Sequence, residues 1–330
     1  MLGLSRSKLY VQLYTDDALT EAWRKVRLGT AIAGVDDVTV GDFEDRLFSN
    51  LKSLQDDLRQ RRYTPQPVKR FYLTKEDGDK RPIGILTVRD RIVQRAILNV
   101  LAPVFEPHFE SCSHGFRRGH SVQTAVADVT RLVQQQHAWL VDLDIAAYFE
   151  HINTARLYKA IKVRLHDRAL LPLIRAILDI ETVVLERPGS WQRVSARGVL
   201  QGGILSALFA NIYLDRFDKQ VLKQGLKLVR YGDDIIVCCR SKAEAEEALK
   251  RVTKLLNRLD LEINPRKTMI VHAEKGFHYL GERLRLKTNK DGEAHLIGVK
   301  RPQRTLLADD APGTSEAIMT LPAEIVEEVD

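Results

Sequence analysis

Two adjacent carboxylates stand between two short apolar segments in the C-terminal half of the chain. They are Asp233 and Asp234, within the stretch Arg-Tyr-Gly-Asp-Asp-Ile-Ile-Val at residues 230–237. Gly232 tolerates the positive φ that a tight hairpin turn needs, so we expect the turn to present both carboxylates at one point. Like charges held this close favour a bound cation, and oxygen ligands select hard ions such as Mg²⁺. Taken alone, the motif is equally compatible with an ordinary solvated turn.

A third carboxylate, Asp144, is expected at the end of another strand. It follows Val141 and Leu143 and precedes Ile145, in the apolar and polar alternation of a half-buried strand. Placed beside the hairpin, Asp144 completes a set of three carboxylates that could hold two metal ions, as phosphoryl transfer requires. Asp142 lies on the same face of this strand and is the alternative ligand.

The spacing of apolar residues predicts the elements that must position these carboxylates. The expected strands are residues 68–73, 81–85, 139–145, 226–231, 235–239, 262–263 and 277–286. The expected helices are residues 89–101, 121–135, 206–220 and 242–259, with further helices before residue 60 and between residues 146 and 178. Pro103 is expected to end the first of these helices. Asp215 and Asp218 are expected to face solvent or to cap a helix.

Charge is distributed unevenly along the chain. The net charge is +7, yet residues 305–330 contain seven acidic residues and no Lys or Arg. Residues 1–304 therefore carry a net charge of +14, which suits a polyanionic partner. A solubilising surface is an equally good explanation of the charge alone.

Neither a membrane span nor a disulfide framework is expected. The chain has no apolar run of about 18 residues, and its first ten residues lack the apolar core of a signal peptide. Three cysteines, Cys112, Cys238 and Cys239, show no metal-ligand spacing. We expect a cytoplasmic protein with reduced thiols and no membrane partner.

Several segments together resemble the reverse transcriptases of bacterial group II introns, including their CRISPR-associated and defence-associated relatives. The resembling segments, in the family's order, are residues 75–85, 89–94, 113–117, 144–152, 198–206, 231–234, 261–268 and 276–281. The matches extend from about Tyr63 to Leu284, and residues 22–36 are similar to the family's leader. This order makes an accidental match very improbable, and it favours Asp144 over Asp142 as the metal ligand.

The resemblance implies an RNA-directed DNA polymerase that extends a primer 3′-hydroxyl with dNTPs. Asp144, Asp233 and Asp234 are then the catalytic carboxylates and bind two Mg²⁺ ions, for which Mn²⁺ could substitute. Ile145 is implied as a further metal ligand. The residues implied to bind the nucleotide are Lys75, Arg81, Phe149, Gln201, Gly202 and Lys267, and those implied in the primer grip are Tyr279, Leu280 and Gly281.

Each implied role has a physical reason and an alternative. Arg81 and Lys75 would clamp the triphosphate through their positive charges, and either could instead be a solvated hairpin charge. Phe149 would pack under the sugar and exclude a 2′-hydroxyl, or serve only as a core aromatic. Lys267 could protonate pyrophosphate, neutralise charge, or be an ordinary surface lysine.

The implied fold is an α+β right-hand polymerase with fingers, a palm whose antiparallel sheet is backed by helices, and a short or absent thumb. We expect the N-terminal region and fingers at residues 1–138 and the palm at residues 139–284, with fingers-proximal helices at about 155–200. Residues 285–330 are expected to form a short C-terminal extension whose acidic end is either a disordered tail or a linker.

The sequence departs from the family pattern at a few positions. Leu200 and Ala207 stand where proline is usual, and Glu150 where aspartate is usual, which changes loop stiffness more than ligand chemistry. The expected partners are an RNA template, a DNA or RNA primer and dNTPs. The expected pathway is CRISPR spacer acquisition with an adaptation integrase, or antiphage defence. The alternatives are a group II intron-encoded retroelement protein and an accessory RNA-binding subunit of an integrase or nuclease complex.

Overall fold

The computed structural model describes residues 8–29, 31–74, 80–187, 190–194, 197–288 and 294–298. The helices are α1 (Lys8–Leu13), α2 (Asp16–Val26), α3 (Val40–Asp45), α4 (Leu47–Arg59), α5 (Val88–Phe105), α6 (Val122–Gln134), α7 (Tyr148–His151), α8 (Thr154–Arg164), α9 (Leu170–Leu178), α10 (Ser206–Lys223) and α11 (Lys242–Asn257). The strands are β1 (Val68–Thr74), β2 (Lys80–Ile85), β3 (Trp139–Asp144), β4 (Thr182–Arg187), β5 (Ser190–Val194), β6 (Lys227–Tyr231), β7 (Asp234–Cys239), β8 (Met269–His272), β9 (Phe277–Tyr279), β10 (Glu282–Thr288) and β11 (Ala294–Gly298).

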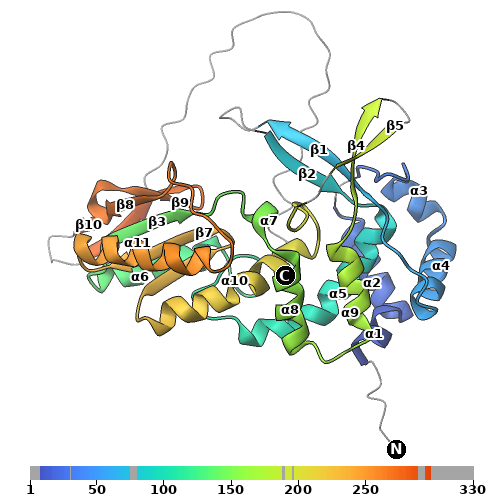
Figure 1. Ribbon diagram of the computed structural model, residues 1–330, viewed down its shortest axis with the longest axis horizontal. Coiled ribbons are helices and arrows are strands. Elements are labelled where there is room, and N and C mark those ends of the chain that lie inside the picture. The colour runs from blue at the N-terminus through green and yellow to red at the C-terminus, as the bar shows by residue number, and fades with distance from the viewer. Residues whose placement is uncertain are drawn as a thin grey trace, which may run out of the picture.

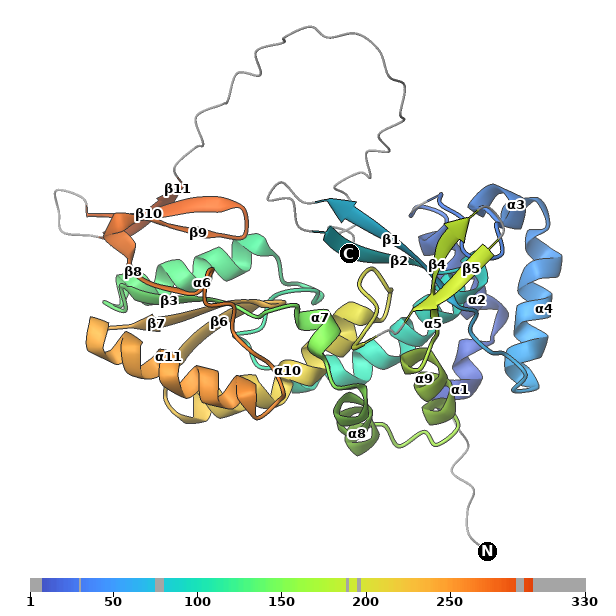
Figure 2. The same ribbon diagram turned by 45° about the horizontal axis from the view of Figure 1, so that its top comes forward.

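A four-stranded antiparallel sheet with the order β6-β7-β3-β8 carries the predicted carboxylates. Successive side chains of a strand point to opposite faces, and this sheet buries both faces. Val141 and Val237 face the core that α10 and α11 cover, whereas Leu140 and Ile236 face a second core beneath α6 and β9–β10. Figure 2 shows the sheet between these two layers. The expected antiparallel sheet backed by helices is confirmed.

Two further sheets flank this one. Strands β11-β10-β9 form an antiparallel sheet beside α6. Strands β2-β1-β4-β5 form the other, on the far side of α10 and α5 (Figure 1). The β1–β2 hairpin was expected, but β4 and β5 were not, because β4 joins β1 through a parallel pairing across more than a hundred residues.

Capping side chains set the start of the helices that support the sheets. Ser121 opens α6 with a reciprocal capping box, and the Ser241 hydroxyl accepts a hydrogen bond from the backbone N–H of Glu244 in α11. Helix α5 does not stop before Pro103, as the sequence predicted, but continues to Phe105. A proline in the last helical turn removes only one hydrogen bond, and buried Leu101 and Phe105 hold that turn against the core.

Within the described residues, no helix is long and apolar enough to cross a membrane. The three cysteines are buried, and Cys238 and Cys239 lie on β7, as expected. Most of the predicted C-terminal extension lies outside the described residues.

Candidate active site

The turn between β6 and β7 is the two-residue loop Gly232-Asp233. Tyr231 pairs with Asp234 across the hairpin, and Gly232 takes φ +63°, as the first position of a type II′ turn requires. Asp233 and Asp234 therefore stand at the tip of the hairpin, as the sequence predicted.

Asp144 lies directly opposite this tip. In the β3–β7 register, Asp144 pairs with Asp234 and Asp142 pairs with Ile236. Because side chains alternate between faces, Asp142, Asp144 and Asp234 share one face of the sheet. Segments 90 residues apart in the chain thus bring carboxylates together at one edge.

Burial, with mutual repulsion as a smaller cause, raises the pKa of two carboxylates in this cluster. Burial raises the pKa of Asp234 to about 6, and the neighbouring Asp233 and Asp144 carboxylates add to the effect. Burial also raises the pKa of Asp142 to about 7, with smaller contributions from Asp234 and Asp144. Asp142 lies inside β3, whereas Asp234 begins β7 at an exposed position.

The donor set fits hard divalent cations. In the part of the chain that the structure describes, no three His, Cys, Asp or Glu side chains are already gathered as a metal-binding group. Without a cation between them, carboxylates repel one another and do not converge. Whether these residues can hold a metal ion is therefore judged from their donor atoms and from the positions of their backbones. Both are compatible with a hard divalent cation, since Asp144 and Asp234 oppose each other, Asp233 adjoins them, and all three supply carboxylate oxygens.

Lys267 reaches the same edge. Its Nζ lies 4.0 Å from Oδ2 of Asp144, and the lysine side chain is 55% exposed. The chain is held there by the backbone N–H of Asn264, which donates to the carbonyl of Asp144 at 2.8 Å. Ile145 forms an isolated bridge with Ile263. Lys267 therefore lies beside the carboxylates and not on a remote part of the surface.

A loop over residues 198–203 connects the carboxylate region with the β1–β2 hairpin. The N–H of Val199 donates to the carbonyl of Phe149 at 2.8 Å, and the N–H of Gly84 donates to the carbonyl of Gln201 at 3.1 Å. Gly198 takes φ +73°, and a Cβ there would lie 2.0 Å from the Phe149 carbonyl oxygen. Only glycine fits this close approach. Gly202, also at positive φ, lies next to β2.

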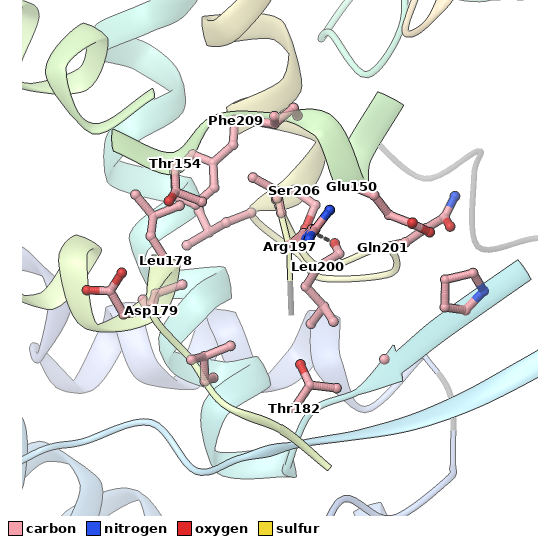
Figure 3. A pocket seen from close by; sticks show the side chains of 18 of the residues that line it. Glu150, Thr154, Leu178, Asp179, Thr182, Arg197, Leu200, Gln201, Ser206 and Phe209 are labelled. Atoms are coloured by element: carbon pink, nitrogen blue, oxygen red, sulfur yellow. Dashed lines mark hydrogen bonds between the residues drawn. The ribbon is translucent and has the colours of Figure 1, made fainter. Parts of the chain in front are cut away.

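A cavity of about 880 Å³ opens on one side of this loop. Figure 3 shows Gln201 and Glu150 on one side of it and Leu178 and Asp179 on the opposite side. Thr182 on β4 is 1% exposed, and among the described residues its hydroxyl has no hydrogen-bond partner. The wall of the cavity contains both apolar and polar side chains.

The two predicted fingers cations are only partly described. Lys75 lies outside the described residues. Arg81 is on β2, where its backbone pairs with Leu73 of β1. Its side chain does not belong to the part of the structure that is described. Their roles remain predictions.

The predicted primer grip lies at the β9–β10 turn. Tyr279 is 3% exposed and belongs to the core beneath Leu140 and Ile236. Leu280 and Gly281 form the turn itself, and Gly281 is exposed. The turn is thus the part that a nucleic acid could contact, with the Tyr279 ring supporting it from below.

One expectation about the surroundings of the carboxylates was wrong. Asp215 and Asp218 were expected to face solvent or to cap a helix, but they are 3% and 1% exposed and lie in the middle of α10. Asp218 forms a fully buried ion pair with Arg230, next to the carboxylate turn. Sequence reasoning missed both partners, although an arginine within an apolar strand was an available signal.

The family described as "Reverse transcriptase (RNA-dependent DNA polymerase)" matches residues 73–284, more than half of the chain. The chain is 29% identical over 308 residues to Protein YkfC of Escherichia coli (strain K12), covering 82% of this chain and 80% of YkfC. It is 28% identical over 351 residues to the group II intron-encoded protein LtrA of Lactococcus lactis subsp. cremoris, covering 85% of this chain and 57% of LtrA. The chain thus spans little more than half the length of LtrA.

Among solved structures, a telomerase of Candida tropicalis truncated from its C-terminal domain superposes with a TM-score of 0.53. The two chains are 13% identical, and the match covers 72% of this chain and 58% of the telomerase chain. At this identity the similarity concerns the fold alone. Together with the family match, it confirms the expected right-hand polymerase fold.

Proposed function

The chain belongs to the reverse transcriptase family, and from that premise we propose that it extends a primer 3′-hydroxyl with dNTPs on an RNA template. The observation that carries the proposal is the register that sets Asp144 opposite Asp234, beside the Gly232-Asp233 turn. In the reaction the primer oxygen attacks the α-phosphate of the dNTP. A new phosphodiester bond forms, and the bond to the β-phosphate breaks to release pyrophosphate.

Asp144, Asp233 and Asp234 would hold two Mg²⁺ ions, and Mn²⁺ could replace them. The side chain of Ile145 has no donor atom, so only its backbone carbonyl could join this set. When bound, such ions lower the pKa of the attacking hydroxyl and neutralise charge on the leaving group. The raised pKa of Asp234 supports a site that a cation completes.

Lys267 would neutralise the leaving pyrophosphate or give it a proton, and its Nζ, 4.0 Å from Oδ2 of Asp144, supports this role. Arg81, with Lys75, would clamp the triphosphate from the β1–β2 hairpin. Phe149 lies beside the loop over residues 198–203 and would exclude a ribose 2′-hydroxyl, which selects dNTPs. These roles place cations at the phosphates and an aromatic ring at the sugar.

Gln201 and Gly202 would line the nucleotide and template pocket. Gln201 contributes to the wall of the 880 Å³ cavity, which has room for an unpaired template nucleotide. The turn at Leu280 and Gly281, supported by Tyr279, would seat the primer end. The excess positive charge would bind the heteroduplex through its phosphates without reading its sequence.

For the pathway, we propose CRISPR spacer acquisition or antiphage defence, in which the chain would act with an integrase or another defence protein. The alternative is a group II intron-encoded retroelement protein, and the similarity to LtrA favours it. The two differ in the RNA that the chain engages. Sequencing the RNA crosslinked to the chain in its native host separates them: one structured intron RNA supports the alternative, and CRISPR or phage transcripts support the proposal.

The polymerase proposal is tested by primer extension with the purified chain, Mg²⁺ and dNTPs, on matched RNA and DNA templates. We expect extension on RNA, which Asp233→Asn abolishes because it removes one metal-binding carboxylate. Matched reactions with NTPs test sugar selection. No product from a folded, RNA-binding chain would overturn the proposal, and product only after addition of a partner complex would favour an accessory role.

A further inference from the structure

A buried arginine stands next to the carboxylate turn. Arg230, on β6, precedes Tyr231 and the Gly232-Asp233 loop, and it is 0% exposed. Its Nε and Nη2 donate to the two carboxylate oxygens of Asp218 at 2.8 and 2.6 Å, and Asp218 is itself 1% exposed. Arginine does not lose its proton in proteins, so this part of the core holds a permanent charge.

Every donor of this guanidinium has an acceptor. Nη1 donates to the carbonyl of Gly232 and to Oδ1 of Asn211, each at 3.0 Å. Nη2 also donates to Oγ of Ser113 at 2.7 Å. Together with the two bonds to Asp218, the five N–H groups of Arg230 make five hydrogen bonds. A side chain with all its donors used has one orientation.

The acceptors come from three separate parts of the chain. Asn211 and Asp218 are seven residues apart on α10, so they lie on one face of that helix. Ser113 belongs to a segment that runs parallel to β6, where the N–H of His114 donates to the Arg230 carbonyl at 2.7 Å. The Asn211 amide also donates to the Gly115 carbonyl at 2.8 Å, which ties this segment to α10.

The network is poorly explained by stability alone. A buried ion pair often contributes no more to stability than well-packed apolar residues would, because both charges lose their hydration. A fully satisfied polar network instead specifies one geometry. Here Arg230 of the network donates a hydrogen bond to the carbonyl of Gly232, and the next residue in the chain is Asp233. A twist of the turn would break this bond.

We infer that Arg230 and Asp218 are positioning residues that fix the Gly232-Asp233 turn and so keep Asp233 and Asp234 aimed at the metal site. The inference rests on the proposed function. It concerns how the carboxylates are held, and neither Arg230 nor Asp218 touches substrate.

Helix α10 supplies a matched control for the test. Asp218→Asn keeps the shape of the side chain and removes the charge that faces Arg230. Asp215→Asn makes the same change three residues away, where a carboxylate that is 4% exposed pairs with Arg164 at 2.8 Å and Lys219 at 2.5 Å. The hydrogen bonds of Asp215 do not reach the hairpin. Both variants therefore lose a charge pair, but only Asp218→Asn loses the contact that positions the turn.

For each variant we would measure the Mg²⁺ concentration that gives half-maximal primer extension, together with kcat, the KM for dNTP and thermal unfolding. We expect both variants to unfold at lower temperature. Only Asp218→Asn should raise the half-maximal Mg²⁺ concentration, by about tenfold, as expected for a coupling of about 1.4 kcal/mol. Its kcat should fall, with the KM for dNTP little changed.

Equal Mg²⁺ requirements in the Asp218→Asn and Asp215→Asn variants would overturn the inference and leave a purely structural ion pair. If Asp218→Asn does not fold, Ser113→Ala replaces it, because it removes one bond to Arg230 and should shift the Mg²⁺ requirement in the same direction. If the unmodified chain extends no primer, the proposed function fails separately. Mn²⁺ affinity then decides the inference, which predicts weaker binding in Asp218→Asn than in Asp215→Asn.

Discussion

Replacing Asp142 with Asn tests which carboxylate of β3 serves the metal site. Asp142 and Asp144 share one face of the sheet, but only Asp144 lies opposite Asp234. Burial, followed by the Asp234 and Asp144 charges, raises the pKa of Asp142 from 3.8 to about 7. The variant removes this buried ionisable group while keeping a side chain of similar shape.

The sign of the effect follows from the raised pKa. Between pH 4 and pH 7 the folded chain keeps a proton on Asp142 that the unfolded chain has lost, so folding stability falls as the pH rises through this range. Raising the pH from 5 to 8, past the pKa of about 7, lowers the stability by about 2.7 kcal/mol, and partial solvent contact reduces the expected value to about 2 kcal/mol. Asp142→Asn should therefore gain about 2 kcal/mol over the unmodified chain between pH 5 and pH 8.

Urea unfolding in EDTA at pH 5 and pH 8 measures this gain in the free energy of unfolding. Primer extension measures the consequence for activity. We expect Asp142→Asn to keep extension within about tenfold, whereas Asp144→Asn should lose about a thousandfold, the effect of several kcal/mol of lost metal stabilisation. An identical pH dependence of unfolding with and without Asp142 would refute the electrostatic argument. Equal loss of extension in the two variants would refute the choice of Asp144.

Three further substitutions probe the surroundings of the carboxylates. Gly198→Ala should lower the free energy of unfolding by about 1–3 kcal/mol or more, because its Cβ would meet the Phe149 carbonyl at positive φ; urea unfolding measures this. Lys267→Ala should lower kcat by about 10- to 100-fold through loss of a cation or acid, and a preserved kcat would remove Lys267 from the chemistry. Phe149→Ala should admit NTPs if the ring excludes the 2′-hydroxyl, and competition between dNTP and NTP incorporation measures the selectivity.

Local patterns sufficed to predict the elements that carry the carboxylates. Strands β3, β6 and β7 alternate apolar and polar residues or are continuously apolar, and the Gly232-Asp233 turn is encoded by adjacent residues. The opposition of Asp144 and Asp234 could be predicted only through family resemblance, because strand register depends on tertiary packing.

What the sequence did not predict depends on distant partners. Strand β4 pairs with β1 in parallel as well as with adjacent β5, and no local pattern encodes the distant partner. Asp218 was expected to face solvent or to cap a helix because an isolated aspartate is usually exposed. Its burial becomes favourable only with Arg230, which lies on a different element.

The central claim is that Asp144, Asp233 and Asp234 together bind a pair of divalent ions where the new phosphodiester bond forms. Mn²⁺ binding to the chain in complex with an RNA template, a primer and a non-hydrolysable dNTP analogue tests it most directly, with spin-resonance titration as the readout. We predict two Mn²⁺ ions per complex, with binding weakened or lost in Asp144→Asn and Asp234→Asn. Unchanged Mn²⁺ stoichiometry and affinity in both variants would contradict the claim.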